Sequence, residues 1–181
     1  TSKACEELVL PALKPSASKR LIQSLQSEGE FGPTVEDSIL AHSAFGSPLY
    51  VVLNYRVSGT LQAGADIIQA CRSVDELFVH CVQLTEVQVG RPLQTFLSLV
   101  ALALSVGTPL QSVELEALVE DIERQDRSVD ELQAEHPKDT ILRVADLDNT
   151  ALGCFITVRG DGGVVLCHDM IVAEVCNMYD L

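Results

Sequence analysis

The chain contains one long stretch without any charged residue, from Pro92 to Val113, and this stretch limits the folds that the sequence can adopt. Its segment Phe96 to Val106 is almost entirely apolar, so it must be buried from water. As a helix, the segment from Pro92 to Val106 spans only about 22 Å, which is short of the roughly 30 Å hydrocarbon core of a membrane. Gly107 and Pro109 then end the helix. We therefore predict the central buried helix of a protein that does not span the membrane.

Length and composition favour one soluble globular domain over residues 1–181. A chain of this size can bury roughly 70% of its unfolded surface, and 47% hydrophobic with 21% charged residues excludes disordered and fibrous classes. Aromatic residues make up 4% with no Trp, which supplies few rings on which nucleic-acid bases could stack. The formal net charge of −14 also opposes a phosphate backbone. We expect no nucleic-acid partner.

The acidic residues are concentrated in one part of the chain. From Ser112 to Asp148 there are 12 acidic residues against 4 basic ones. This excess is typical of a solvated helix face, which aids solubility, and it is also compatible with a surface that steers a basic partner. The sequence is compatible with both interpretations.

The cysteine pattern favours free thiols. The chain has six scattered cysteines: Cys5, Cys71, Cys81, Cys154, Cys167 and Cys176. A domain of this size needs no disulfides to fold, and Thr1–Cys5 does not resemble a secretory signal. We expect mostly buried, reduced thiols and an intracellular, reducing compartment, cytoplasmic or organellar after removal of a targeting segment.

The cysteines and histidines do not have the spacing of a metal site. His80-Cys81 and Cys167-His168 are adjacent pairs, but structural zinc usually takes ligands two to four residues apart. Two adjacent residues on a strand point to opposite faces, so each pair would supply one ligand there. We therefore expect no metal site, and a metal- or small-molecule-binding module is kept as the second alternative function.

The N-terminal half is expected to mix helices and strands. Ser16–Ser27 has helical periodicity, and a helical period returns from Thr60 to Cys71. Between them, Ser38–Val57 is predicted as two extended segments, with Leu49–Leu53 as the stronger strand because it is rich in β-branched and aromatic residues. A hairpin turn is expected around Gly46–Pro48.

The middle of the chain is predicted to be mainly helical. Ser73–Glu76 has the pattern of a capping box, in which the Ser side chain and the Glu side chain satisfy free amides at a helix start. Val82–Val89 is predicted as a strand, and Val113–Glu135 as a long acidic amphipathic helix. The inward side chains expected on that helix are Leu115, Leu118, Val119 and Ile122.

The C-terminal part has the clearest strand signals. Thr140–Ala145, Leu152–Arg159 and Val164–Cys167 are predicted strands, and Gly160–Gly163 is a tight hairpin turn between the last two. Asp169 is expected to cap a final helix. The predicted fold class is α+β, with a helical middle packed against a small, mostly antiparallel sheet that includes a C-terminal β-hairpin.

An internal similarity suggests a duplication. Asp66–Leu77 recurs at an offset of 55 residues as Asp121–Leu132, with identical residues at eight of twelve positions. One interpretation is a repeated unit of helix, capped helix and strand, covering residues 58–89 and 106–144, whose two copies share one core. The alternative is coincidence, because Ser-x-x-Glu is a common helix start.

One short motif points to phosphate chemistry. The residues Val144-Ala145-Asp146-Leu147-Asp148-Asn149-Thr150 resemble the first motif of haloacid-dehalogenase-type phosphatases. The resemblance implies that Asp146 attacks phosphorus and Asp148 acts as general acid and base beside Mg²⁺. It covers seven residues, and the 31 residues after Thr150 contain no Lys, which the family requires. A hydrolase of the phosphatase type centred on Asp146 and Asp148 is thus the first alternative function.

The remaining motifs give no further catalytic set. No Gly-x-Ser-x-Gly elbow occurs, no cofactor fingerprint is found, and Arg159-Gly160-Asp161 is accounted for by the hairpin turn. The catalytic residues are therefore unknown, and an enzymatic function is not favoured. We expect a non-catalytic protein-binding role, such as an assembly factor, a chaperone-like adaptor or a subunit of a larger complex. The expected partner is a protein with a basic surface or a second copy of the chain.

Overall fold

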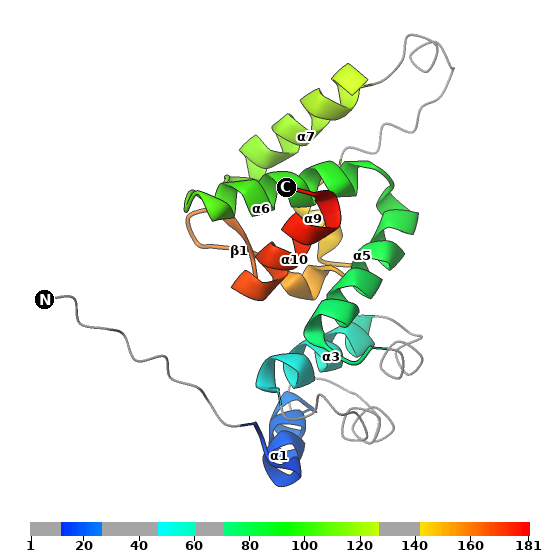
Figure 1. Cartoon of the computed structure of the whole chain (residues 1–181), viewed down its shortest axis with the longest axis vertical. Helices are drawn as coiled ribbons and strands as arrows, with labels where there is room; N and C mark the ends of the chain where they lie inside the picture. The colour runs from blue at the N-terminus through cyan, green and yellow to red at the C-terminus, as the bar shows by residue number, and fades with distance from the viewer. Residues whose placement is uncertain (1–11, 27–46, 61–70, 127–141) are drawn as a thin grey trace, which may run out of the picture.

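The computed structural model describes residues 12–26, 47–60, 71–126 and 142–181 and has an α+β fold (Figure 1). Helices dominate the described residues, and the strands form a two-stranded antiparallel sheet near the C-terminus. The elements in chain order are α1 (Pro15–Gln26), α3 (Pro48–Thr60), α5 (Val74–Val89), α6 (Pro92–Ser105), α7 (Ser112–Asp126), α9 (Val144–Leu147), the 3₁₀ helix η2 (Gly153–Phe155), β1 (Ile156–Val158), β2 (Val164–Leu166) and α10 (Asp169–Tyr179).

Helix α6 lies at the centre of the core, as its lack of charge predicts. One face is fully buried, and the side chains on it are Leu93, Phe96, Leu97, Val100 and Ala101. Helices α5 and α10 and strand β2 pack against α6, and α10 lies beside α6 and α5 in Figure 1. Among the described residues, no helix is both long and apolar enough to cross a bilayer.

Helix α5 begins with the predicted capping box. The Ser73 Oγ accepts the Glu76 N–H at 3.1 Å, and the Glu76 carboxylate accepts the N–H of Arg72. This satisfies amides that have no partner within the helix. At the other end, Gly90 adopts φ 79°, a conformation that glycine tolerates, and Pro92 occupies the first turn of α6. Two adjacent helices are thereby joined by a very short turn.

The helix predicted at Ser16–Ser27 is confirmed as α1, but the strand predicted at Leu49–Leu53 is wrong, because these residues lie in helix α3. Pro48 is the first residue of that helix instead of part of a hairpin turn. The other extended segment, over residues 38–46, lies outside the described part of the chain.

The apolar run of α3 fits a helix as well as a strand, because buried side chains lie on most sides of the helix. The consecutive residues Leu53, Asn54 and Tyr55 are all buried, whereas Arg56 is exposed. Such a helix shows no clear amphipathic period. Its packing against α1 and α5 overrides the strand preference of its β-branched residues.

The strand predicted at Val82–Val89 is also wrong, since it forms the second half of α5. Val82 and Thr85 are buried three residues apart, as on one helix face, while Val87 is 87% exposed. At Thr140–Ala145, residues 140 and 141 lie outside the described part of the chain. Arg143 is extended, but Val144 already begins helix α9, so no strand is formed over the described residues 142–145.

The C-terminal hairpin is confirmed but is shorter than predicted. Strand β1 pairs with β2 in an antiparallel register that places Ile156 opposite Leu166 and Val158 opposite Val164. Residues 153–155 of the predicted strand Leu152–Arg159 form η2 instead, so strand β1 is limited to Ile156–Val158. In the turn, Gly162 adopts φ 86° and the Asp161 carboxylate accepts the Gly163 N–H at 3.0 Å.

The chain segment between α6 and α7 runs along the hairpin. Gln111 forms an antiparallel bridge with Gly163. The Val164 N–H donates to the Leu110 carbonyl at 2.8 Å, and the Ser112 N–H donates to the Gly162 carbonyl at 3.1 Å. These bonds fix the start of α7 to the tip of the hairpin.

The final helix α10 is confirmed, with a different cap from the one predicted. His168 is the N-cap, and its Nδ1 accepts the Met170 N–H at 3.1 Å, whereas Asp169 lies in the first turn. The ring of Phe155, in η2, meets that of Phe78, in α5, edge to face, with centroids 5.2 Å apart. These contacts fasten the hairpin region to the helical core.

Helix α7 is the acidic amphipathic helix predicted from the sequence, here described as far as Asp126. It packs mainly against α6 and extends away from the other helices in Figure 1. Leu115 and Val119 are buried as expected, but Leu118 and Ile122 remain 40% and 36% exposed, which corrects the expectation that all four point inward.

The proposed duplication stays a prediction. Residues 61–70 and 127–141, which contain part of each matching segment, lie outside the described residues, as does the helical period expected from Thr60 to Cys71 apart from its ends. The strand of the first unit is wrong, because Val82–Val89 is helical, and in the second unit Val144 begins helix α9. The capped helix is confirmed in the first unit at Ser73.

Candidate functional site

The phosphatase-like motif does not have the geometry that its resemblance implies. Asp146 and Asp148 are both exposed, on helix α9 and directly after it, rather than at the end of a strand. Thr150 is buried and holds the following turn, since its Oγ1 donates to the Leu147 carbonyl at 2.8 Å and accepts the Leu152 N–H at 3.2 Å. The motif residues thus form a helical turn with a structural threonine.

The lysine that such chemistry needs is not beside these aspartates in the described part of the chain. The described lysines, Lys14 and Lys19, directly precede α1 or belong to it, and α1 packs against α3. Figure 1 shows α1 at the far end of the molecule from α9. Among the described residues, therefore, no observation favours the hydrolase alternative.

The five cysteines of the described residues are free thiols, while Cys5 lies outside these residues. Burial raises the pKa of the Cys154 thiol to about 12, with a smaller contribution from neighbouring Cys167. Burial is also the main cause of the raised pKa values of Cys71, Cys81 and Cys167. The raised pKa values favour the neutral thiol at neutral pH, whereas the thiolate is the nucleophile and the metal ligand.

The two histidine and cysteine pairs are not assembled into a metal centre. Within the described ranges, no group of three His, Cys, Asp or Glu side chains could hold a metal ion. Nδ1 of His168 is occupied in capping α10. His80 shares a surface hollow with Cys71 instead of with Cys167.

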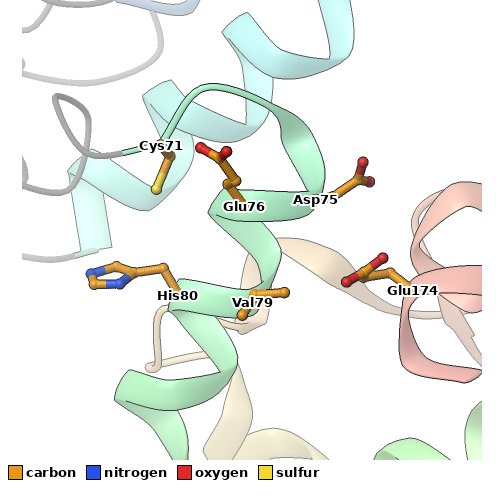
Figure 2. A pocket seen from close by; sticks show the side chains of 6 residues that line it. All are labelled: Cys71, Asp75, Glu76, Val79, His80 and Glu174. Carbon is orange, nitrogen blue, oxygen red and sulfur yellow. The ribbon is translucent and has the colours of Figure 1, made fainter. Parts of the chain in front are cut away.

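This hollow, of about 360 Å³, lies between helices α5 and α10 (Figure 2). It is lined by Cys71, Asp75, Glu76, Val79, His80 and Glu174. Figure 2 shows Glu174 reaching from α10 toward α5, whereas the His80 ring extends from the opposite side of α5. The lining therefore offers three carboxylates and one imidazole around the first turns of α5.

The carboxylates of the hollow have a structural explanation. Asp75 and Glu76 occupy the first turn of α5, where negative charge is favoured by the helix dipole, and Glu76 also completes the cap. The neighbouring thiol of Cys71 has a raised pKa, due first to burial and then to the charge of Glu76. The hollow thus lacks an activated nucleophile and suits contact with a cationic group better than chemistry on a bound substrate.

A second hollow, of about 250 Å³, lies between α6 and α7. We call it the α6–α7 groove, and its lining residues are Arg91, Gln94, Thr95, Ser98, Leu99 and Ile122. The Thr95 Oγ1 donates to the Glu123 carboxylate at 2.5 Å, which ties the two helices together at the groove. Leu102, 47% exposed, lies on the same face of α6 as Thr95 and Ser98, one or two turns further along.

The groove was missed in the sequence, although a signal for it exists. The apolar stripe of α7 continues beyond Val119 to Ile122, and the charge-free helix α6 precedes it. Periodicity alone assigns the whole stripe to the core, because it shows which residues share a face but not how far a neighbouring helix covers that face.

Comparison with known proteins gives no family for this chain. No family model matches the sequence, and neither a curated protein nor a solved structure is significantly similar to it. Its function is therefore inferred from the surface of the molecule itself.

Proposed function

We propose that this chain has a non-catalytic protein-binding role, as an assembly factor, a chaperone-like adaptor or a subunit of a larger complex. The observation that supports the proposal is the distribution of exposed apolar side chains. Five of the nine large apolar side chains exposed among the described residues belong to α6, α7 and the segment joining them: Leu102, Val106, Val113, Leu118 and Ile122. Leu118 and Ile122 share one face of α7, which packs against α6, whereas Val113, nine residues before Ile122, points to the opposite side of the helix. Partly exposed apolar side chains on two adjoining helices favour an interaction site over isolated surface residues.

The binding mode favoured by this surface is contact with helix faces rather than strand addition. A partner strand would need free backbone groups at the edge of the hairpin. At the start of the outer edge of β2, however, the Val164 N–H already donates to Leu110 and Gln111 bridges Gly163, which leaves less of this edge for a partner strand. The faces of α6 and α7 offer side chains instead.

Native mass spectrometry of the protein, purified gently from its own source, tests this role. We expect a stoichiometric protein partner on the wild-type chain and its loss from the Leu102→Asp variant, because a charge would be buried in the contact. Met170→Asp is the matched control: Met170 is 45% exposed against 47% for Leu102, but lies in the first turn of α10, where an acidic residue is tolerated.

Three results would count against the proposal. A bare monomer would remove its basis, and so would a complex that both variants retain, since the partner would then bind elsewhere. A chain that carries only Mg²⁺ or zinc would favour the alternative functions, and phosphatase assays of the Asp146→Asn variant would then separate the hydrolase from a metal-binding module.

A further inference from the structure

The α6–α7 groove extends along about two helical turns of α6. Its lining residues along α6 run from the N-cap Arg91 to Leu99, which corresponds to about 12 Å at 1.5 Å per residue. The floor side chains are short or flexible, Thr95, Ser98 and Leu99, and Ile122 of α7 forms the wall. Because both flanking elements are helices, their backbone groups are largely engaged internally, and an occupant must be recognised through side chains.

The outward face of α6 is unusual because it carries no charge. A surface helix normally has charged residues on the side away from the core. In α6 the exposed positions are Gln94, Leu102 and Ser105. Apart from the exposed N-cap Arg91, which lines one end of the groove, this face can be removed from water without charge desolvation, so it suits a buried contact.

The face of α7 beside the groove combines apolar and acidic side chains. Leu118 and Ile122 are one turn apart and only partly covered. Glu114 lies four residues before Leu118 and Asp121 three residues after it, so both carboxylates border the apolar stripe. Both are exposed, and Asp121 keeps 65% of its side-chain surface despite its contact with Arg124. The complementary surface is an apolar stripe bordered by basic residues.

Charge argues against a second copy of the chain as the occupant. A twofold contact would place the same surface of two molecules face to face. The sequence of α7 contains six acidic residues and one basic residue, Arg124, so two such helices would repel each other. The net charge of −14 acts in the same direction.

We propose that the α6–α7 groove and the exposed residues beside it bind an amphipathic helix of a partner protein. The apolar side chains of that helix contact Leu99 and Ile122 in the groove and Leu102 beside it, and its lysines or arginines lie beside Glu114 and Asp121 of α7, away from Arg91. This inference rests on the proposed protein-binding function and specifies the chemistry of its partner. It corresponds to the helix-in-groove mode of recognition, in which apolar anchors recur at three- and four-residue spacing.

A synthetic helical peptide tests the inference on the full chain. The probe is a fluorescein-labelled peptide of leucine and lysine with leucines on one helical face. One comparison peptide has the same composition in an order that destroys the stripe, and a second replaces every lysine by glutamate. We expect fluorescence anisotropy to report binding of the first peptide, clearly weaker binding of the second and none of the third.

Substitutions in the groove give the site of binding. Leu102→Gln is expected to weaken binding about fivefold, because the exposed half of a leucine is no longer buried, and fivefold is about 1 kcal/mol. The double variant Leu102→Gln/Ile122→Gln should lose about 25-fold, and Glu114→Gln/Asp121→Asn should weaken binding and reduce its salt dependence. Met170→Gln is the control and should bind as the wild type does. Thermal unfolding of each variant verifies that it is folded.

Several outcomes would overturn the inference. Equal binding of the ordered and disordered peptides would indicate charge attraction alone, and unchanged binding by Leu102→Gln/Ile122→Gln would place the peptide elsewhere. Dimerisation of the wild-type chain in sedimentation that Leu102→Gln abolishes would identify a second copy as the occupant. If the native complex is lost in Leu102→Asp while the peptides do not discriminate, the protein-binding function stands and the occupant's chemistry is wrong. If no native partner exists, the function itself fails.

Discussion

The edge-to-face pair of Phe78 and Phe155 connects the hairpin region to the helical core, and its strength can be measured with a double-mutant cycle. Both rings are fully buried, and their centroids, 5.2 Å apart with planes at 65°, lie within the favourable range for aromatic pairs. Such a pair contributes about 0.5 to 1.5 kcal/mol beyond the area that it buries. We therefore expect Phe78→Leu and Phe155→Leu each to lower the free energy of unfolding by about 1 to 2 kcal/mol.

The double variant is expected to lose about 1 kcal/mol less than the sum of the two single losses. Urea unfolding followed by far-ultraviolet circular dichroism is the suitable assay, because the chain is largely helical and has no tryptophan. With a slope of about 2 kcal/mol per M, a coupling of this size corresponds to about 0.5 M in the midpoint.

Phe96→Leu provides the control for the cycle, since Phe96 is equally buried but lies on α6. The losses in unfolding free energy caused by Phe96→Leu and by Phe155→Leu should add up in the double variant to within about 0.5 kcal/mol. A Phe78/Phe155 cycle that is also additive within this margin would refute the reasoning, because the two rings would then contribute only as separate apolar groups.

Three local features of the fold are open to direct measurement. Ser73→Ala removes the acceptor for the Glu76 N–H and should lower the free energy of unfolding by about 1 kcal/mol. This corresponds to a fall of about 2 to 4 °C in the melting temperature. An unchanged melting temperature would show that the cap is dispensable. Gly162→Ala should destabilise the chain by about 1 kcal/mol or more in urea unfolding, because φ is 86°; the added Cβ would also displace the tip of the flexible Gln111 side chain, whose Oε1 lies 2.5 Å away. Gly160→Ala, where the added Cβ meets no atom within 4 Å, should be close to neutral, and equal losses of stability in the two variants would contradict the prediction. Burial raises the pKa of Tyr50 to about 12, above its value of about 10 in the unfolded chain. The neutral phenol is thus favoured in the folded state, and its contribution to stability is complete below about pH 10 and is lost as the pH rises toward 12. The unfolding free energies of the wild type and of Tyr50→Phe, measured between about pH 10 and 12, check the prediction. If the wild type loses no more stability across this window than Tyr50→Phe does, the prediction is contradicted.

The parts of the fold that could be predicted are those in which local chemistry and the apolar pattern agree. The charge-free segment at α6, the cap at Ser73 and the turn at Gly160–Gly163 each have a local cause, and each is found. The strands predicted at Leu49–Leu53 and Val82–Val89 failed because alternating or continuous apolar residues also fit a helix that is buried on several sides.

The candidate surface was predictable only in part. The sequence indicates an acidic helix and a basic partner, and it shows that Leu118 and Ile122 share a face with Leu115. Their partial exposure depends on how α7 crosses α6, which is set by packing and by the bonds of Ser112 to the hairpin tip. Crossing geometry of this kind is a property of two helices together and is not encoded in the periodicity of either one.

The position of α10 in the core has a consequence for synthesis of the protein. Helix α6 needs α10 to cover its apolar face, yet about 64 residues separate the end of α6 at Ser105 from the start of α10 at Asp169. At about 5 to 20 residues per second, the ribosome takes roughly 3 to 13 s to supply the covering helix. During that interval the nascent chain exposes its most apolar segment, which makes it a substrate for chaperones and leaves it prone to aggregate if translation stalls before Asp169.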